Sequence, residues 1–399
     1  MALLILNAGS SSLKCAVFED DGDTVRAQAE IDWRGDTRTA ALSVFRGGTT
    51  LLETNETIED IPQAILRIRQ ALLEQKLLSG ARDVRAIGQR VVHGGMAFRA
   101  SVKLSADVRR EIATLSELAP LHNPPALKSM EGAEQAFPGT PQFAVFDTAY
   151  YASLEPRRFI YPLPYKWFEE WGIRRFGFHG ISHAYIAGRA AQMLGRQDLR
   201  LVSCHLGNGC SVTASRAGQA VATSMGFTPL EGVMMGTRAG SVDPGILFYV
   251  QKKFGVSPTE MESVLNHESG LKGVSGVSRD LRLVEEAAAS GNSRARLALD
   301  LFADRVRETI GAMAVTLGGL DALVFTAGIG EHSAPIRSAI SEGLDCLSIS
   351  IDLEKNRSAR ADCAITRAPG GVAVLVLHTD EERLIARETA RLLASSSAA

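Results

Sequence analysis

Short apolar runs alternate with amphipathic stretches along this chain. A short apolar run bounded by turn residues is typical of a buried strand, whereas apolar residues three or four apart predict an amphipathic helix. This spacing predicts a helix over 62–79, a long helix over 294–317 that ends at Gly318–Gly319, and a helix from Thr379. The alternation of strands and helices predicts a mixed α/β fold. The apolar runs that predict strands are 3–6, 13–18, 143–147, 200–206, 210–215, 322–326 and 372–377.

The chain contains the same local arrangement twice. A strand, a glycine-containing turn and a second strand occupy 3–18, and the same order occupies 200–216. We therefore expect two similar α/β lobes with a cleft between them, over 1–150 and 151–382. Glycine turns between strands are common, so the repeated pattern alone leaves a coincidence open.

Composition narrows the class of protein. Of the 399 residues, 45% are hydrophobic and 22% are charged, which is typical of globular domains and excludes a disordered chain. Lysine and arginine total 43 against 45 aspartate and glutamate residues, so the formal net charge is −2. The chain lacks the general basic field of a nucleic-acid-binding protein, and we expect no nucleic-acid partner. The total charge does not exclude a local basic cleft, because it does not show where the charges lie.

The cysteines and the N-terminus bear on the cellular compartment. Five cysteines, an odd number without a C-x-x-C pair, argue against a disulfide framework or a zinc ribbon and indicate a reducing compartment. The N-terminal apolar run is short and has no basic segment before it, so we do not interpret it as a signal peptide. No apolar stretch approaches the length of a transmembrane helix. We expect a cytoplasmic protein with no membrane partner.

Three glycine-containing segments are candidate phosphate-binding turns. The chain has neither a Walker A motif nor G-x-G-x-x-G, so any nucleotide must be bound by other means. The segments 7–14, 205–209 and 328–332 each follow or end a strand and offer bare backbone N–H groups, and Lys14 adds a positive charge. Each alone is compatible with a plain turn. Three of them in one chain indicate a phosphate-bearing ligand.

Four further segments combine arginine or histidine with glycine or proline. Arg238 lies among glycines at 236–240, where it can present its guanidinium group to a phosphate or a carboxylate. A histidine in such a segment either binds a ligand or completes the protein's own hydrogen bonds, and residue type alone does not decide between the two. The other segments are 89–95 with Arg90 and His93, 121–125 with His122, and 176–183 with His179 and His183.

Taken in order, these motifs resemble the acetate kinase family, which belongs to the superfamily of sugar kinases, heat-shock chaperones and actin. The resemblance extends from Asn7 to residues 379–382. It implies two duplicated actin-like (ribonuclease H-like) lobes, with a C-terminal helix over 383–399 that packs back onto the N-terminal lobe. The motifs are N-A-G-S-S-S-L-K, R-V-V-H-G-G, L-H-N-P-P, V-F-D-T-A, G-F-H-G-x-S-H, H-L-G-N-G, M-G-F-T-P-L-E-G, M-G-T-R, T-A-G-I-G-E and T-D-E-E.

The resemblance implies reversible phosphorylation of acetate by ATP, giving acetyl phosphate and ADP through direct in-line transfer. It also implies Mg²⁺ as the metal, with Mn²⁺ as a substitute, and a homodimer that acts on the route to acetyl-CoA. A propionate or butyrate kinase is one alternative, because one methylene of an acyl pocket changes selectivity only modestly. A nucleotide-dependent clamp is another, although it gives no use for Arg90 and Arg238 together.

The family's functional positions transfer to this chain through the matching motifs. Asn7 and Glu381 are the expected magnesium-site residues. The expected catalytic residues are Asp147, His179, Arg238 and Arg90, with His122 on the same cleft. The expected substrate-binding residues are Arg90, Val92, Leu121, Phe178 and Pro229. The expected nucleotide-binding residues are Lys14, His205, Leu206, Gly207, Asn208, Gly209, Asp280, Leu281, Arg282, Gly328, Ile329, Gly330, Glu331 and His332.

Charge is the main requirement of this reaction, because the acceptor and the phosphoryl group are both anions. Arg90, Arg238, Lys14, His179 and Mg²⁺ are expected to supply the opposing charge. Acetate is already ionised at neutral pH, since carboxyl pKa values are about 4. Asp147 therefore has no proton to remove, and we expect it to order Mg²⁺ or its water.

A local motif predicts a helix-capping role for Glu382, and a few other residues depart from the family's usual motifs. Residues 379–382 match a capping box with Thr379 as N-cap and Glu382 reaching back, which would leave Glu381 to face a metal. Some residues depart from the family's usual motifs without removing a proposed catalytic group. His332 and Cys210 among them leave nucleotide preference open. The departures are Gln89, Ile181, Cys210, Ser241 and His332.

Overall fold

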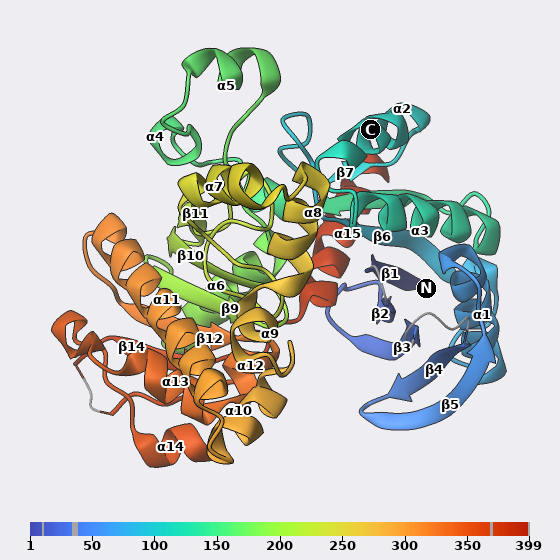
Figure 1. Cartoon of the computed structure of the whole chain (residues 1–399). Coiled ribbons are helices and arrows are strands. Elements are labelled where there is room, and N and C mark those ends of the chain that lie inside the picture. Colours follow the sequence, from blue (N-terminus) through green and yellow to red (C-terminus); the bar gives the residue numbers. More distant parts are fainter. Residues whose placement is uncertain (10–11, 34–38, 368–369, 398–399) are drawn as a thin grey trace. The chain divides into compact units, whose positions relative to one another are not determined.

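The computed structural model describes residues 1–9, 12–33, 39–367 and 370–397 (Figure 1). The chain forms two compact units, of which the first comprises Met1–Ala152 with Asp380–Ala399 and the second comprises Ser153–Thr379. Each unit contains a mixed sheet with helices packed on it, which confirms the α/β class. In the part of the chain that is described, no helix combines the length and hydrophobicity that crossing a bilayer requires.

The first unit is built on an eight-stranded sheet in the order β5-β4-β3-β2-β1-β6-β8-β7. The first five strands along the chain form an antiparallel meander, whereas β6 pairs parallel to β1, and β8 parallel to β6. The carboxyl ends of β1, β6 and β8 therefore lie at one edge of the sheet. The strands are β1 (Ala2–Ala8), β2 (Ser12–Glu19), β3 (Val25–Trp33), β4 (Thr39–Arg46), β5 (Thr49–Thr57), β6 (Val84–Val91), β7 (Val102–Lys103) and β8 (Gln142–Phe146).

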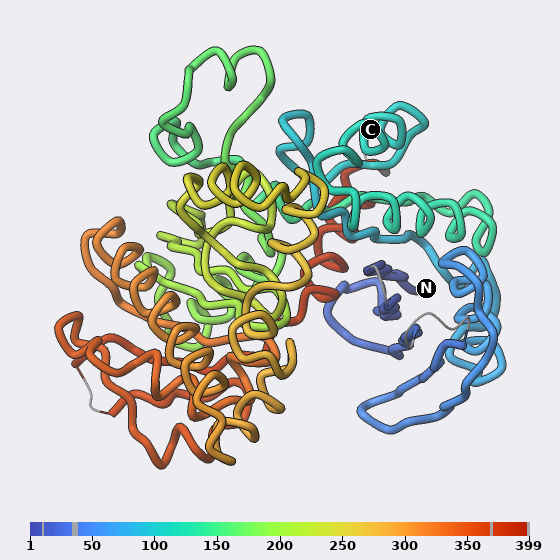
Figure 2. The backbone as a smooth tube through the Cα atoms, in the orientation of Figure 1, coloured from blue at the N-terminus to red at the C-terminus, as the bar shows by residue number. Residues whose placement is uncertain are grey.

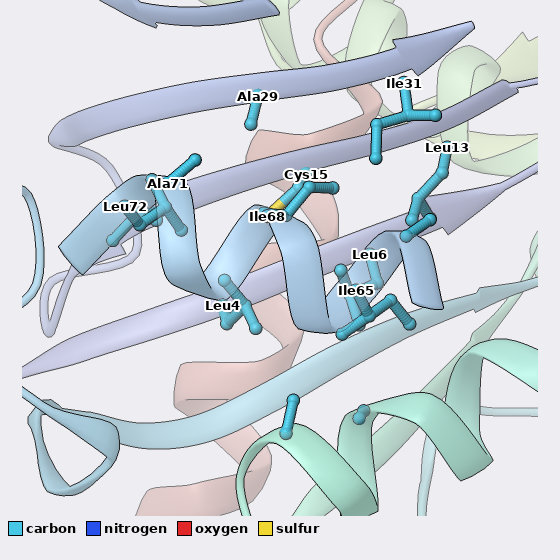
Figure 3. Packing of buried hydrophobic residues seen from close by; sticks show 14 of the residues in the cluster. Leu4, Leu6, Leu13, Cys15, Ala29, Ile31, Ile65, Ile68, Ala71 and Leu72 are labelled. Carbon is cyan, nitrogen blue, oxygen red and sulfur yellow. The ribbon is translucent and has the colours of Figure 1, made fainter. Parts of the chain in front are cut away.

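Helix α1 (Ile61–Glu74) covers one face of this sheet. Asp60 caps the helix by accepting a hydrogen bond from the Gln63 N–H, and proline in the first turn needs no donor partner. Figure 3 shows Ile65 and Ile68 of α1 packed over Leu4 and Leu6 of β1. This core depends on strand alternation, because only every second residue of β1 points toward α1. The other helices of the unit are α2 (Ala106–Thr114), α3 (Asn123–Ala136) and α15 (Glu381–Ser397), with 3₁₀ turns at Ala81–Asp83, Leu115–Glu117 and Asp147–Tyr151.

The C-terminal helix α15 packs against β1 and β6, so the first strand and the last helix of the chain lie side by side in the first unit (Figure 2). The contact is closest at Gly88 of β6. A Cβ atom there would lie 2.4 Å from Thr389 Oγ1, 2.8 Å from Ile385 Cγ2 and 2.9 Å from Ile5 Cδ1. Glycine at this position therefore lets the helix approach the strand.

The second unit is built on a six-stranded sheet in the order β11-β10-β9-β12-β14-β13. Helix α6 (Gly180–Leu194) packs Ile186 and Ala190 against Leu201 and Val324 of the sheet. The strands are β9 (Arg200–Leu206), β10 (Cys210–Arg216), β11 (Gln219–Thr223), β12 (Ala322–Thr326), β13 (Cys363–Ala364) and β14 (Ala373–Val376). The other helices are α4 (Pro156–Phe159), α5 (Tyr165–Trp171), α7 (Pro244–Phe254), α8 (Pro258–Ser263), α9 (Gly270–Ser275), α10 (Leu281–Ala289), α11 (Ser293–Leu317), α12 (Ala327–His332), α13 (Ala334–Ser341) and α14 (Leu353–Ser358), with a π-helical turn at Val264–Glu268 and a 3₁₀ turn at Leu344–Leu347.

The two sheets share one topology, which confirms the duplication. The order β3-β2-β1-β6-β8 in the first unit matches β11-β10-β9-β12-β14 in the second, with antiparallel pairs up to β1 or β9 and parallel pairs after it. The repeated hairpin of the sequence is therefore the start of a repeated sheet.

Two of the expected phosphate-binding turns differ from the sequence-based prediction. Asn7 lies inside β1 and pairs across the hairpin with Lys14, because the strand continues to Ala8. Residues 10 and 11 of the same motif lie outside the described residues. Gly328 and Gly330 belong to the short helix α12 rather than to an open turn.

Replacing Gly88 with alanine tests the packing of α15. We expect Gly88→Ala to lower the free energy of unfolding by about 1–3 kcal/mol, because the added methyl group overlaps Thr389 and Ile385. The measurement is the midpoint of urea unfolding. Gly80→Ala is the matched control, since Gly80 is extended and a Cβ there meets nothing within 4 Å. Equal losses of stability in the two variants would contradict this account.

Candidate active site

Arg90 is the centre of a polar cluster at the carboxyl edge of the first sheet. It lies near the end of β6, while Asp147 directly follows the neighbouring strand β8. Arg90 Nη2 donates to Asp147 Oδ2 at 2.7 Å, and Nη1 donates to Asn7 Oδ1 at 3.1 Å. Nη1 also lies 3.5 Å from Glu381 Oε2, at the start of α15. Parallel strands that end together thus gather these side chains, as at ligand sites of open α/β sheets.

Burial and neighbouring charges shift the pKa of Arg90 in opposite directions. Burial disfavours the charged guanidinium group, but the carboxylates of Asp147 and Glu381 outweigh it and raise the pKa of Arg90 above its usual range. Asp147 is 0% exposed, so its charge is balanced by Arg90 rather than by bulk water. The cluster therefore holds a permanent cation between two acids.

The same cluster has the donor chemistry of a magnesium site. Asn7, Asp147 and Glu381 offer amide and carboxylate oxygens around Arg90, and hard divalent cations prefer such oxygens. Among the described residues, no three or more His, Cys, Asp or Glu side chains group as a metal cage.

The expected cap of α15 is wrong. Asp380 Oδ1 accepts from the Arg383 N–H at 2.9 Å, so Asp380 rather than Thr379 is the N-cap. Aspartate caps helices as well as threonine does, and the helix begins one residue later than the sequence suggests. Glu382 Oε1 instead lies 3.5 Å from Asn7 Nδ2. Glu381, the first residue of the helix, still reaches Arg90.

The expected acyl-pocket residues of the first unit lie on two connected loops. Val92 follows β6 and is buried, whereas Leu121, just before α3, is 45% exposed. Asn123, in the first turn of α3, accepts from the His93 N–H and donates to the His93 carbonyl, both at 3.1 Å. This pair of bonds fixes the start of α3, and with it His122, against the loop that carries Val92.

His179 has an unusual backbone conformation at the start of α6. It is in the left-handed region at φ 55°, as the N-cap residue of the helix, directly after the buried Phe178. Its Nδ1 lies 2.9 Å from Ser211 Oγ of β10, and its ring stacks on that of His205 with centroids 4.2 Å apart. His205 Nδ1 in turn lies 2.8 Å from Ser182 Oγ. Three elements thus hold the imidazole of His179.

Arg238 lies beside His179. A Cβ atom at Gly209 would lie 3.3 Å from His179 Nε2 and 3.6 Å from Arg238 Nη1, so both side chains converge on the turn between β9 and β10. Arg238 Nη1 donates to the Pro229 carbonyl at 3.2 Å, and burial lowers the pKa of Arg238. In the described parts of the chain, Arg238 forms no ion pair with a carboxylate. It therefore carries positive charge that the protein itself does not neutralise.

The expected nucleotide-binding segments occupy three turns of the second unit. Residues 205–209 form the β9–β10 turn, closed by a bond from the Gly207 N–H to the Gly209 carbonyl. Asp280 caps α10 by accepting from the Arg282 N–H at 3.0 Å. Residues 328–332 form α12, where Glu331 Oε1 accepts from the Ala327 N–H at 3.0 Å.

Several polar residues of the second unit were not among the expected functional residues. His183, Ser203 and Ser211 form a buried hydrogen-bonded chain that ends at His179. Arg337 is 1% exposed and donates to the carbonyls of Gly330 and Glu331 at 2.9 Å. One feature of the sequence could have indicated this hydrogen-bonded chain. His183 follows His179 by four residues, and residues at this spacing lie on the same side of a helix.

Comparison with known proteins agrees with these arrangements. The model of the acetokinase family matches residues 2–387. Acetate kinase from Nostoc punctiforme is 47% identical over 407 residues, covering 98% of this chain and 100% of that protein. The crystal structure of Porphyromonas gingivalis acetate kinase superposes with a TM-score of 0.90 at 36% identity, covering 98% of this chain and 99% of that one. The crystal structure of a propionate kinase from Francisella tularensis superposes with a TM-score of 0.91 at 37% identity, again covering 98% of this chain and 99% of that one. The chain therefore belongs to the acetokinase family.

Proposed function

We propose that this chain transfers the γ-phosphoryl group of ATP to acetate, reversibly, and forms acetyl phosphate and ADP. An acetate oxygen bonds to the γ-phosphorus while the bond from that phosphorus to the β–γ bridging oxygen breaks, and ADP leaves with the electron pair. The observation that carries the proposal is Arg90, a buried cation among acids at a strand edge, in a chain that matches the acetokinase family over residues 2–387.

Arg90 would hold the acetate carboxylate, because its planar fork matches two carboxylate oxygens. Val92, Leu121, Phe178 and Pro229 would line the methyl group. His179 and Arg238 would donate to the transferring phosphoryl group, since both converge on Gly209. Lys14 and the three turns of the second unit would bind the nucleotide, and His122 would face the reactants.

Asn7, Asp147 and Glu381 would hold Mg²⁺, for which Mn²⁺ could substitute, as their oxygens suit either ion. A divalent ion there would neutralise charge on the phosphate oxygens. The function of Asp147 is then to orient ligands rather than to remove a proton. Placement in the cytoplasm is supported by the five cysteines, which are all free of disulfides.

A direct assay tests the activity. Purified protein with acetate, ATP and Mg²⁺ should produce acyl phosphate, detected as the hydroxamate, and Arg90→Ala should lower kcat/KM for acetate about a hundredfold or more, as loss of a charged donor does. Arg85→Ala, which removes an exposed arginine from the same strand, is the matched control. GTP and pyrophosphate serve as alternative donors. Absence of acyl phosphate with every donor would refute the proposal.

A propionate kinase is the second candidate, because the Francisella tularensis protein of that name is as similar in structure as the acetate kinase. The branched Val92 should keep the acyl pocket short and favour acetate. We expect Val92→Ala to raise kcat/KM for propionate relative to acetate, by about tenfold for a pocket one methylene larger. Competition between the two acids gives the ratio directly. An unchanged ratio would remove Val92 from the pocket lining.

A homodimer is part of the proposal and is supported by α7. Ile246, Phe248, Tyr249 and Phe254 on this helix are 52–67% exposed, and α7 buries none of its residues in the chain. An apolar surface of this kind marks a contact with another molecule.

We expect the wild-type chain to sediment as a dimer, and Phe248→Glu to sediment as a monomer with an unchanged circular dichroism spectrum. Gln251→Glu is the control, because it also adds one negative charge to the same helix but lies in the widest gap between these apolar residues around the axis. A monomeric wild-type protein, or a Phe248→Glu variant that remains dimeric, would contradict the assignment.

A further inference from the structure

Residues 224–243 connect β11 to α7 without a helix or a strand, and this long loop carries both Pro229 and Arg238. Its backbone lies outside the sheet ladders, so other contacts must fix its path. Loops of this length are uncommon in compact domains and are typically functional. The contacts that hold the first half of the loop therefore bear on the position of Arg238.

Two anchors of the loop converge on one hydroxyl group. Tyr161, which lies between α4 and α5, accepts a hydrogen bond from the Phe227 N–H at 2.9 Å. The same hydroxyl donates its proton to Glu231 Oε2. A backbone N–H only donates, so the directions of both bonds are determined. Residues 227–231 thus form a short segment that is closed at both ends on Tyr161.

The hydroxyl group of Tyr161 keeps its proton near neutral pH. Burial, together with the bond to Glu231, raises the pKa of Tyr161 above its ordinary value, although the neighbouring Arg175 opposes this shift. Tyr161 therefore remains a neutral group that accepts one hydrogen bond from the loop and donates another to it.

Arg175 completes the cluster. Its Nη2 donates to Glu231 Oε1, so the carboxylate also has a cationic partner. Its Nη1 donates to the carbonyls of Thr223, Ser224 and Met225, at 3.3, 3.0 and 2.8 Å. Hydrogen bonds from a charged donor are stronger than those between neutral groups. One guanidinium group thus joins the end of β11, the start of the loop and Glu231.

The backbone of the loop passes directly against this cluster. A Cβ atom at Gly226 would lie 1.8 Å from Glu231 Oε2 and 2.2 Å from the hydroxyl oxygen of Tyr161. The Gly226 carbonyl accepts from the Phe176 N–H at 2.9 Å. The loop is therefore held by its backbone, by the side chain of Glu231 and by close packing at a glycine.

Pro229 is at the middle of the closed segment. It lies two residues after Phe227 and two residues before Glu231, the two residues that bond to Tyr161. Its carbonyl accepts from Arg238 Nη1 at 3.2 Å. The proline ring restricts φ, which removes one degree of freedom from this part of the backbone. A shift of the segment would therefore displace the acceptor of Arg238.

We propose that Tyr161, Glu231 and Arg175 are positioning residues for Arg238. By closing residues 227–231 on one hydroxyl group they fix the Pro229 carbonyl, and this carbonyl holds the guanidinium group of Arg238 in the direction that suits the phosphoryl group. The inference rests on the proposed phosphoryl transfer for its purpose. The closure of the segment itself can be measured without turnover.

Hydrogen exchange of Tyr161→Phe tests the closure. The substitution removes the hydroxyl group alone, so the Phe227 N–H loses its acceptor and Glu231 loses a donor. We expect the amides of 225–231 to exchange about tenfold faster or more, while exchange in β9, β10 and β12 stays as in the wild type. Tyr165→Phe, which removes the hydroxyl group of an exposed tyrosine in α5, is the matched control. Unchanged exchange over 225–231 would overturn the proposal, whether or not the protein phosphorylates acetate.

Kinetics test whether the cluster acts through Arg238. We expect Tyr161→Phe to lower kcat about tenfold to a hundredfold with the KM for ATP unchanged, because a misplaced group reduces the rate without weakening nucleotide binding. In an Arg238→Ala background the same substitution should lower kcat less than about twofold, since the group that it positions is already absent. Wild-type kcat in Tyr161→Phe, or an equal loss in the two backgrounds, would overturn the positioning role.

Arg175→Lys is the second variant of the cluster. It keeps a positive charge beside Glu231, but an ammonium group lacks the planar fork that reaches the carboxylate and the carbonyls together. We expect the same lower kcat, again without further loss in the Arg238→Ala background, and equal losses in both backgrounds would exclude Arg175 from the positioning role. Failure of the wild-type protein to form acyl phosphate would refute the proposed function, and hydrogen exchange would still decide whether Tyr161 closes the segment.

Discussion

The pairing of Arg90 with buried carboxylates is the interaction on which the first unit's site depends. A buried charge without a partner is strongly unfavourable, so the fold must place acids beside this guanidinium group. The parallel strands β6 and β8 end at the same edge of the sheet, which places Asp147 beside Arg90. Helix α15 brings Glu381 to the same place from the C-terminal part of the sequence. Both acids thus stabilise the same buried guanidinium group.

The second unit uses the opposite electrostatic arrangement. Arg238 bonds to a carbonyl and a sulfur atom rather than to an acid, and burial lowers its pKa. A guanidinium group kept in this way interacts more strongly with an incoming anion than one already paired with a carboxylate. His179, whose Nδ1 lies 2.9 Å from the Ser211 hydroxyl, lies beside it at the same turn. One unit thus has the charges that suit a carboxylate and a metal, and the other those that suit a phosphoryl group.

Part of this could be predicted from sequence, because three helices (α1, α11 and α15) and seven strands follow their hydrophobic patterns, and the repeated hairpin predicted the repeated sheet. The seven strands are β1, β2, β8, β9, β10, β12 and β14. Errors arose where neighbouring residues compete for one role. Thr379 and Asp380 are both good N-caps, and Thr379 instead bonds to Ser182 and Glu331, which are distant in sequence. The hydrogen-bonded chain from Ser203 to His179 could not be predicted from local sequence patterns. Its members come from α6, β9 and β10, and only the packed unit brings them together.

Two helices of the second unit begin at a residue with a strained backbone. His179 and Ala327 both have a left-handed conformation, with φ of 55° and 63°, which costs a residue with a side chain about 1 kcal/mol or more. Each is at the entrance to a helix of the second unit, α6 or α12, and each is held by a side chain of its surroundings. Ser211 bonds to His179, and Glu331 accepts from the Ala327 N–H while also contacting His378 at 2.9 Å. Such strain persists only where neighbours over-determine the conformation. The hydrogen bond between Ser211 Oγ and His179 Nδ1 therefore also helps to keep this backbone conformation in place, which gives the buried serine a role that an apolar residue could not fill.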